Sequence, residues 1–369
     1  MHESKQGARS RRWLPWAALV GALVVGGVAG GAIVAATKSS ASTPASSGTS
    51  SASGQVSACN VTSVADKVLP SVVTIAASGQ SGSGTGSGEI IRSDGYILTN
   101  NHVIAVAANG GSVQVQFSDG QTERATITGR DTLTDLAVLK VDDTHHFPVI
   151  ALGSSSAVKV GEASVVLGAP LGLSGTVTSG IVSALDRTIQ VPAENDKTAL
   201  LVSAIQTDAS INPGNSGGAM VNCAGQLVGV PTAGATVPSP SGEASGGSIG
   251  LGFAIPVDLA KTISDEIIAT GSVTHAYFGL QTVPVPPAAA AEAGVPEGLF
   301  VRAVLTGGPA AQAGLRAEDI ITKINGEAAT SNVQLQELTL TKKPGDKIPV
   351  EYWRNGHTAT TTVTLGTQP

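Results

Sequence analysis

The sequence predicts a mainly β protein that follows a transmembrane helix and ends in a smaller mixed α/β module. Three observations favour this fold class. Short β-branched runs separated by turn residues fill the middle of the chain, and an uncharged apolar run occupies residues 13–37. Hydrophobic residues make up 41% of the 369 residues while aromatic residues make up only 3%. The core must therefore be built from Val, Ile, Leu and Ala, which suits short packed strands.

The apolar run predicts a membrane anchor because about 20 apolar residues suffice to cross a bilayer as a helix. Residues 1–12 carry Lys and Arg, so the positive-inside rule places them in the cytoplasm and exports the rest. We expect a single-pass protein of the cell membrane with a retained signal anchor at 13–37. A cleaved signal peptide remains the alternative. Residues 38–57 are rich in Ser, Ala, Gly and Thr, which predicts a flexible linker.

The exported part begins with strand signals. Many short strands without helices between them indicate an all-β barrel or sandwich. The glycine run at 79–88 leads into another strand rather than a helix, so we expect a flexible hairpin loop there and no phosphate site. The strand candidates are residues 71–77, 96–100, 112–117, 124–129, 135–141, 163–168 and 199–205.

A helix and a change of pattern place the domain boundary. Apolar residues recur at helical spacing in 259–270, and Gly271 supplies a stop. The first domain is therefore assigned to 58–260 and the second to 272–367. In the second, Ser331 and Gln334 form a capping box, and Asn355-Gly356 predicts a tight hairpin.

Charge and cysteine content exclude several classes of function. The net charge of −6 argues against a nucleic-acid partner, which requires a basic surface. Two cysteines rule out a disulfide-rich mini-fold and a zinc site made of cysteines alone.

The strongest chemical signal is the run Gly214-Asn215-Ser216-Gly217-Gly218. A serine between glycines can sit on a sharp turn, exposing its hydroxyl while backbone N–H groups point toward a developing oxyanion. An ordinary glycine turn is the alternative.

A nucleophilic serine needs a base and an acid that orients the base. His102 directly follows the apolar strand predicted at 96–100, which gives it a rigid support. Asp135 stands at the start of another apolar strand, where a buried carboxylate needs a partner. Asp131 is the competing acid. The other histidines lie in less suitable places: His2, His145, His146, His275 and His357.

Four segments in this order resemble the HtrA (Deg) family of trypsin-like serine proteases, and the C-terminal module resembles the PDZ domain of that family. The resemblance covers roughly residues 60–367. The segments are TNNHVI, DTLTDLAVLKV, TDASINPGNSGGAMVN and GLGFAIPVD.

The resemblance implies a chymotrypsin-like fold of two six-stranded β-barrels with the active site between them. It implies that His102 is the general base, Asp135 its orienting partner and Ser216 the nucleophile. The backbone N–H groups of Gly214 and Ser216 would form the oxyanion hole, with Asn215 shaping the turn. Leu251 and Ile255 would contribute to a small apolar substrate pocket.

The same resemblance implies the partners. The family cleaves unfolded or misfolded polypeptide without metal, ATP or another cofactor, and it assembles as a homotrimer. The second domain would bind peptide C-termini at a carboxylate-binding loop formed by Tyr277, Phe278, Gly279 and Leu280. Residues 231–249 would form a mobile specificity or activation loop beside the site.

Two features need separate interpretation. The segment 316–319 lacks the glycine that usually precedes the acidic residue of that PDZ turn. Cys59 and Cys223 are both exported on the predicted topology, which favours a disulfide between them over two free buried thiols. A chaperone or peptide-sensing adaptor, in which PDZ binding matters more than cleavage, is the alternative function.

Overall fold

The computed structural model describes residues 59–142, 147–169, 175–192, 198–234 and 248–368. The membrane anchor predicted at 13–37 and the linker at 38–57 lie outside these residues. Within the described part of the chain, no helix combines the length and apolarity needed to span a membrane.

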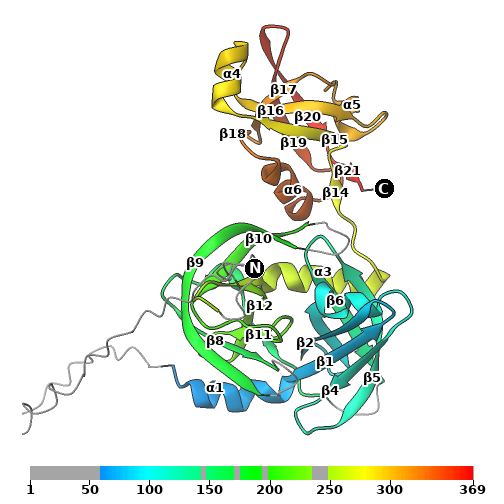
Figure 1. Cartoon of the computed structure of the whole chain (residues 1–369), viewed down its shortest axis with the longest axis vertical. Coiled ribbons are helices and arrows are strands. Elements are labelled where there is room, and N and C mark those ends of the chain that lie inside the picture. Colours follow the sequence, from blue (N-terminus) through cyan, green and yellow to red (C-terminus); the bar gives the residue numbers. More distant parts are fainter. Residues whose placement is uncertain (1–58, 143–146, 170–174, 193–197, 235–247, 369) are drawn as a thin grey trace, which may run out of the picture. The chain divides into compact units, whose positions relative to one another are not determined.

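The first strands form a closed barrel in the order β1-β2-β3-β6-β5-β4 (Figure 1). Every neighbouring pair is antiparallel. Alternate side chains point inward, and Ile75, Ile90, Ile97, Val115 and Leu139 are fully buried. The strands are β1 Val72–Gly79, β2 Gly82–Ile90, β3 Tyr96–Asn100, β4 Ser112–Gln116, β5 Thr122–Asp131 and β6 Leu136–Val141.

The glycine run differs from its prediction because most of it is strand β2 rather than loop. A Cβ on Gly84 would lie 2.7 Å from the Val103 carbonyl oxygen, and a Cβ on Gly86 would lie 2.6 Å from the Val103 side chain. The glycines therefore allow the segment after β3 to pack directly against β2.

The second barrel has the strand order β11-β8-β9-β10-β13-β12-β7, and an additional pairing of β11 with β12 joins six of these strands into a ring. The two-barrel arrangement expected from the family resemblance is thus confirmed. The strands are β7 Ala151–Leu152, β8 Ala163–Gly168, β9 Thr176–Pro192, β10 Thr198–Thr207, β11 Ala219–Val221, β12 Gln226–Gly234 and β13 Gly252–Pro256.

Short helices complete this region. Helix α1 (Val61–Val68) and a 3₁₀ turn (Leu69–Ser71) precede β1. Helix α2 (Asn101–Ile104) and a second 3₁₀ turn (Ala105–Ala107) follow β3, and a third 3₁₀ turn (Ser155–Ala157) precedes β8.

A disulfide joins Cys59, just before α1, to Cys223, just after β11, with a Cα–Cα distance of 5.3 Å. The predicted pairing is confirmed.

Helix α3 (Val257–Thr270) confirms the predicted helix and ends at Gly271, whose φ of 81° is left-handed. Its apolar face packs Ala260, Ile263 and Ile267 into a core shared with both barrels. A Cβ on Gly129 of β5 would lie 2.3 Å from the Gly271 carbonyl oxygen, so that close approach requires glycine.

The C-terminal module is a sheet in the order β15-β16-β17-β19-β20 with three short helices and its own apolar core. The capping box at Ser331 and the turn at Asn355-Gly356 are confirmed. The elements are β14 Ala276–Tyr277, β15 Leu280–Val285, α4 Pro287–Ala293, β16 Gly298–Val304, α5 Pro309–Gln312, β17 Ile320–Ile324, β18 Glu327–Ala328, α6 Asn332–Thr341, β19 Lys347–Arg354, β20 His357–Thr364 and β21 Gly366–Thr367.

Candidate active site

The structure brings His102 and Asp135 together at the edge of the first barrel. His102 lies in α2, and its Nδ1 is 2.8 Å from Asp135 Oδ2. The His102 backbone N–H also donates to Asp135 Oδ1 at 3.0 Å. The His102 side chain is 41% exposed, whereas that of Asp135 is 7% exposed. A buried acid thus holds an imidazole that substrate can reach.

Asp135 is held in an unusual backbone conformation. Its φ is 58°, and a left-handed residue other than glycine costs about 1–2 kcal/mol. Its carbonyl oxygen accepts hydrogen bonds from the Asn100 side chain at 2.9 Å and from the Asn101 backbone at 3.1 Å. These bonds tie the acid to the junction of β3 and α2, the helix that carries His102.

Thr232 is a third member of this cluster. It is buried on β12, and its Oγ1 donates to Asp135 Oδ2 at 2.5 Å. Its carbonyl oxygen accepts a hydrogen bond from Ser216 Oγ at 3.3 Å. The sequence reasoning missed Thr232 because it assigned residues 231–249 to a loop. Residues 231–234 of that segment instead complete β12, and 235–247 lie outside the described residues.

Ser216 sits on the predicted turn between two glycines in left-handed conformations, Gly214 with φ 103° and Gly217 with φ 78°. A Cβ on Gly217 would lie 2.3 Å from Thr99 Oγ1, so this position requires glycine in two respects. The Gly217 N–H donates to the Pro231 carbonyl at 2.9 Å. Among the described residues, Ser216 Oγ donates to Thr232 and makes no hydrogen bond with His102.

The turn leaves two backbone donors available. Within the described ranges, neither the Gly214 N–H nor the Ser216 N–H donates to a protein acceptor. Asn215 is buried, and its side-chain amide donates to the Ser210 carbonyl at 3.3 Å, which braces the turn. The arrangement can therefore offer two N–H groups to a developing oxyanion.

Asp131 has a different partner. It is buried, and its Oδ1 lies 2.9 Å from His275 Nε2 while its Oδ2 accepts a hydrogen bond from Thr134 Oγ1. Of the two acids considered from the sequence, Asp135 contacts His102, and Asp131 contacts the segment that follows α3.

The two predicted pocket residues are placed differently. Leu251 is 38% exposed, directly before β13. Ile255 is 2% exposed because its side chain lies on the face of β13 that packs into the core with Ala260 and Ile263 of α3. Only Leu251 is thus at the surface, and Ile255 supports the site from within.

The predicted carboxylate-binding loop connects β14 to β15. Phe278 is buried in the module's core, and Gly279 has a φ of 76°. In the described part of the chain, the Phe278 and Gly279 N–H groups donate to no acceptor. The strand β15 that follows pairs with no strand other than β16 there, and the Thr282 carbonyl oxygen of β15 accepts a hydrogen bond from the Asn332 side chain at 3.0 Å.

One ionisable group is buried in the wall behind the site. Glu89 on β2 is 0% exposed, and neither carboxylate oxygen has a hydrogen-bond partner among the described residues. It is on the same face of β2 as Ser87, whose hydroxyl donates to the Gly214 carbonyl at 2.6 Å. Burial raises the pKa of the Glu89 carboxyl well above its usual range, and the opposing effect of its own backbone amide is smaller.

Comparison with protein families matches both domains. Residues 86–230 match the trypsin-like peptidase domain, and residues 276–365 match the PDZ domain. Among solved structures, the HtrA-type protease AlgW with a decapeptide superposes with a TM-score of 0.67 at 32% sequence identity. That match covers 84% of this chain and 99% of the AlgW chain.

Curated relatives agree. The serine protease PepD of Mycobacterium tuberculosis is 42% identical over 314 residues, which are 83% of this chain and 66% of PepD. A probable periplasmic serine endoprotease of Halomonas elongata, described as DegP-like, is 39% identical over 286 residues. These are 77% of this chain and 56% of that relative. The chain thus spans between half and two thirds of the relatives' length.

Proposed function

Because this chain belongs to the HtrA family of serine proteases, we propose that it is an endopeptidase cleaving unfolded or misfolded polypeptides outside the cytoplasm. The observation that carries the proposal is the contact of His102 with a buried Asp135 beside the Ser216 turn. The Ser216 hydroxyl, the exposed imidazole and the two available N–H groups supply the nucleophile, the base and the oxyanion stabilisation that acyl transfer requires.

In the proposed mechanism, Ser216 Oγ attacks the scissile carbonyl carbon while His102 removes its proton. The Gly214 and Ser216 N–H groups stabilise the oxyanion. The imidazolium then protonates the leaving amine, and the acyl-enzyme is hydrolysed by water in the reverse sequence. Asp135 orients the imidazole and stabilises the imidazolium that forms. The hydroxyl must first turn from the Thr232 carbonyl toward His102.

The PDZ module supplies the proposed regulation or substrate capture. We infer that a peptide C-terminus binds the N–H groups of the 277–280 loop while the peptide pairs with the edge of β15 that no other strand occupies. Thr282 of β15 and Asn332 of α6 are joined by two hydrogen bonds, from Thr282 Oγ1 to Asn332 Oδ1 at 2.6 Å and from Asn332 Nδ2 to the Thr282 carbonyl oxygen at 3.0 Å, so a bound peptide strand would displace the second bond.

The remaining elements of the proposal come from sequence and family. Residues 13–37 tether the protein to the membrane, with both domains on the outer side, and the assembly is a homotrimer. The description of the Halomonas relative as periplasmic agrees with an extracytoplasmic site.

Cleavage of casein by the purified protein tests the function. Ser216→Ala should reduce the rate by about 10⁴-fold or more because triad members act as a unit. The matched control is Ser179→Ala, an exposed serine on β9 of the same barrel, which should retain activity. Equal cleavage by the wild-type protein and by Ser216→Ala would refute the proposal.

A further inference from the structure

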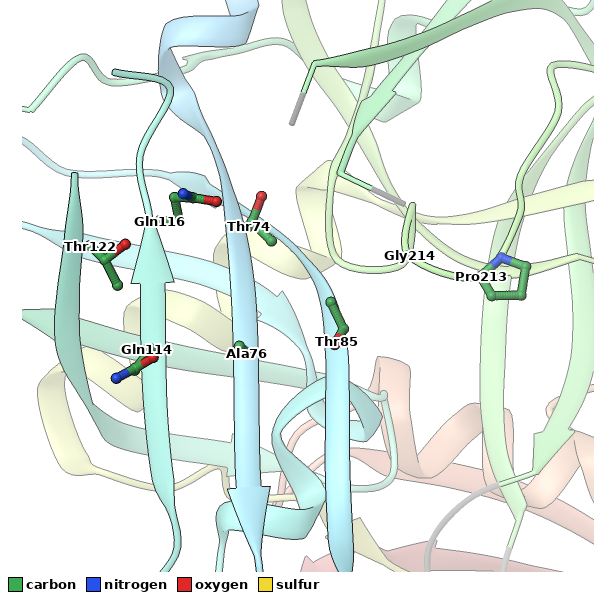
Figure 2. Close-up of a pocket in the computed structure, with 8 residues that line it drawn as sticks. All are labelled: Thr74, Ala76, Thr85, Gln114, Gln116, Thr122, Pro213 and Gly214. Carbon is green, nitrogen blue, oxygen red and sulfur yellow. The ribbon is translucent and has the colours of Figure 1, made fainter. Parts of the chain in front are cut away.

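A groove of about 500 Å³ without charged lining residues lies beside the active site, on the outer face of the first barrel (Figure 2). Its lining residues come from four strands and from the loop before Ser216, and none of them is charged. They are Thr74, Ala76, Thr85, Gln114, Gln116, Thr122, Pro213 and Gly214.

Strand register arranges these side chains in two rows. In one row Thr85, Ala76 and Gln114 are cross-strand partners on β2, β1 and β4. The other row consists of Thr74, Gln116 and Thr122, on β1, β4 and β5, and its register continues into Ser87 of β2, which is fully buried and does not line the groove. Figure 2 shows the labelled members of both rows, with Pro213 and Gly214 opposite them. Ala76, the smallest side chain, forms the floor.

The groove is continuous with the active site. Ser87, which continues the second row, donates its hydroxyl to the Gly214 carbonyl at 2.6 Å. Its backbone N–H donates to the Ser216 carbonyl at 2.9 Å. Gly214 itself lines the groove and carries one of the two proposed oxyanion donors. A substrate whose scissile carbonyl oxygen binds the Gly214 and Ser216 N–H groups would therefore have its neighbouring residues in this groove.

The position of the base decides which half of the substrate enters the groove. His102 belongs to the first barrel and delivers its proton to the leaving amine, so the leaving half departs over that barrel. The exposed Leu251, proposed to contact the acyl half, belongs to the second barrel. The groove extends from β2 to β5, which is three inter-strand spacings or about 14 Å. An extended peptide of about four residues has this length.

On this basis we propose that the groove binds the substrate segment C-terminal to the scissile bond and prefers uncharged polar side chains there. The inference rests on the proposed endopeptidase function. Hydroxyl and amide groups can donate and accept hydrogen bonds with Ser, Thr, Asn or Gln side chains and with backbone amides. Nothing in the lining compensates the desolvation of a charged side chain. The nearest charge on either row is Arg124, the cross-strand partner of Gln114.

Paired substrates test this proposal on the full chain in detergent. All share one acyl half and carry either a small arylamide leaving group or a four-residue extension that is neutral polar, acidic or basic. The readout is the ratio of kcat/KM for each extended peptide to that for the arylamide, which cancels general changes in the catalytic residues. The neutral polar extension should give a ratio about tenfold above those of both charged extensions, as expected for one or two net hydrogen bonds.

A charge introduced into the groove provides the second measurement. Gln114→Glu keeps the side-chain shape and should shift the preference to the basic extension by about tenfold, the effect of one charge-assisted hydrogen bond. Gln190→Glu makes the same change at an exposed site on β9 and should leave every ratio unchanged.

The inference would be overturned if the wild-type protein gave equal kcat/KM ratios for all extensions. It would also be overturned if the wild-type protein preferred acidic extensions because of Arg124. Unchanged ratios in Gln114→Glu would overturn it as well. Absence of cleavage of every substrate, the arylamide included, would instead contradict the proposed function.

Discussion

Replacing Glu89 by Gln should remove the part of the fall in unfolding free energy with rising pH that comes from the Glu89 carboxyl. The carboxyl of Glu89 is fully buried without a hydrogen-bond partner among the described residues, and burial raises its pKa. In the unfolded chain the same group titrates near its ordinary value of 4.5. Protonation of the Glu89 carboxyl therefore contributes its full stabilisation below about pH 4.5. This contribution is lost as the pH rises toward the raised pKa of Glu89 in the folded protein.

The magnitude follows from proton counting. While the native state keeps the proton and the unfolded state has lost it, the unfolding equilibrium constant rises about tenfold per pH unit. Each pH unit over which the native state alone keeps the proton lowers the unfolding free energy by about 1.4 kcal/mol. Gln has nearly the same shape and binds no proton, so the variant should lack this loss.

Urea unfolding at pH 5, 6 and 7 measures the effect, as the difference in unfolding free energy between wild type and Glu89→Gln. The difference should grow in favour of the variant as the pH rises. The matched control is Glu297→Gln, which removes an exposed carboxylate from the second domain. If wild type and Glu89→Gln lose stability in parallel from pH 5 to pH 7, Glu89 is ionised in the native state and the reasoning fails.

Three further predictions concern other parts of the molecule. Thr232→Val keeps the side-chain shape but removes the donor to Asp135, so kcat/KM on a peptide substrate should fall about 10- to 100-fold; an unaltered value would show that this hydrogen bond does not support catalysis. Glu318→Gly should raise the unfolding free energy by about 0.5–1 kcal/mol in urea titrations, because Glu318 has a φ of 74°; destabilisation would contradict the strain argument. Replacing Cys59 and Cys223 by Ala should lower the unfolding free energy by up to about 5 kcal/mol, since the bond spans a sequence separation of 164. A reductant should lower the unfolding free energy of the wild type by a similar amount and should leave that of the double variant unchanged.

Local signals predicted the elements that local interactions determine. Helix α3 and the hairpin at Asn355-Gly356 depend on periodicity and turn chemistry within a few residues. The position usually filled by glycine in the PDZ turn also proved informative. Glu318 occupies it in the left-handed conformation that glycine adopts without strain.

Features that depend on distant contacts could not be predicted from local pattern. The bond from Thr232 to Asp135 spans 97 residues, and nothing in the composition around Thr232 indicates it. The glycine run suggested a mobile loop, yet its glycines are required by the approach of Val103. The motif that contains Ile255 also does not reveal that its side chain points toward the core shared with α3, which leaves it 2% exposed.

The contact between His102 and Asp135 also depends on a backbone state that sequence does not reveal. Asp135 adopts its left-handed conformation because Asn100 and Asn101 bind its carbonyl oxygen. The order of the residues identified the two partners, but only the fold explains how the acid reaches both the ring and the backbone of the histidine.

The bond between Cys59 and Cys223 also determines how mechanical tension enters the protein. Helix α1 lies inside the covalent loop that this bond closes. A pull on the chain ahead of Cys59 is therefore transmitted through sulfur to the turn between β11 and β12, and α1 cannot be peeled away turn by turn. In a reducing compartment the same pull would act on α1 first.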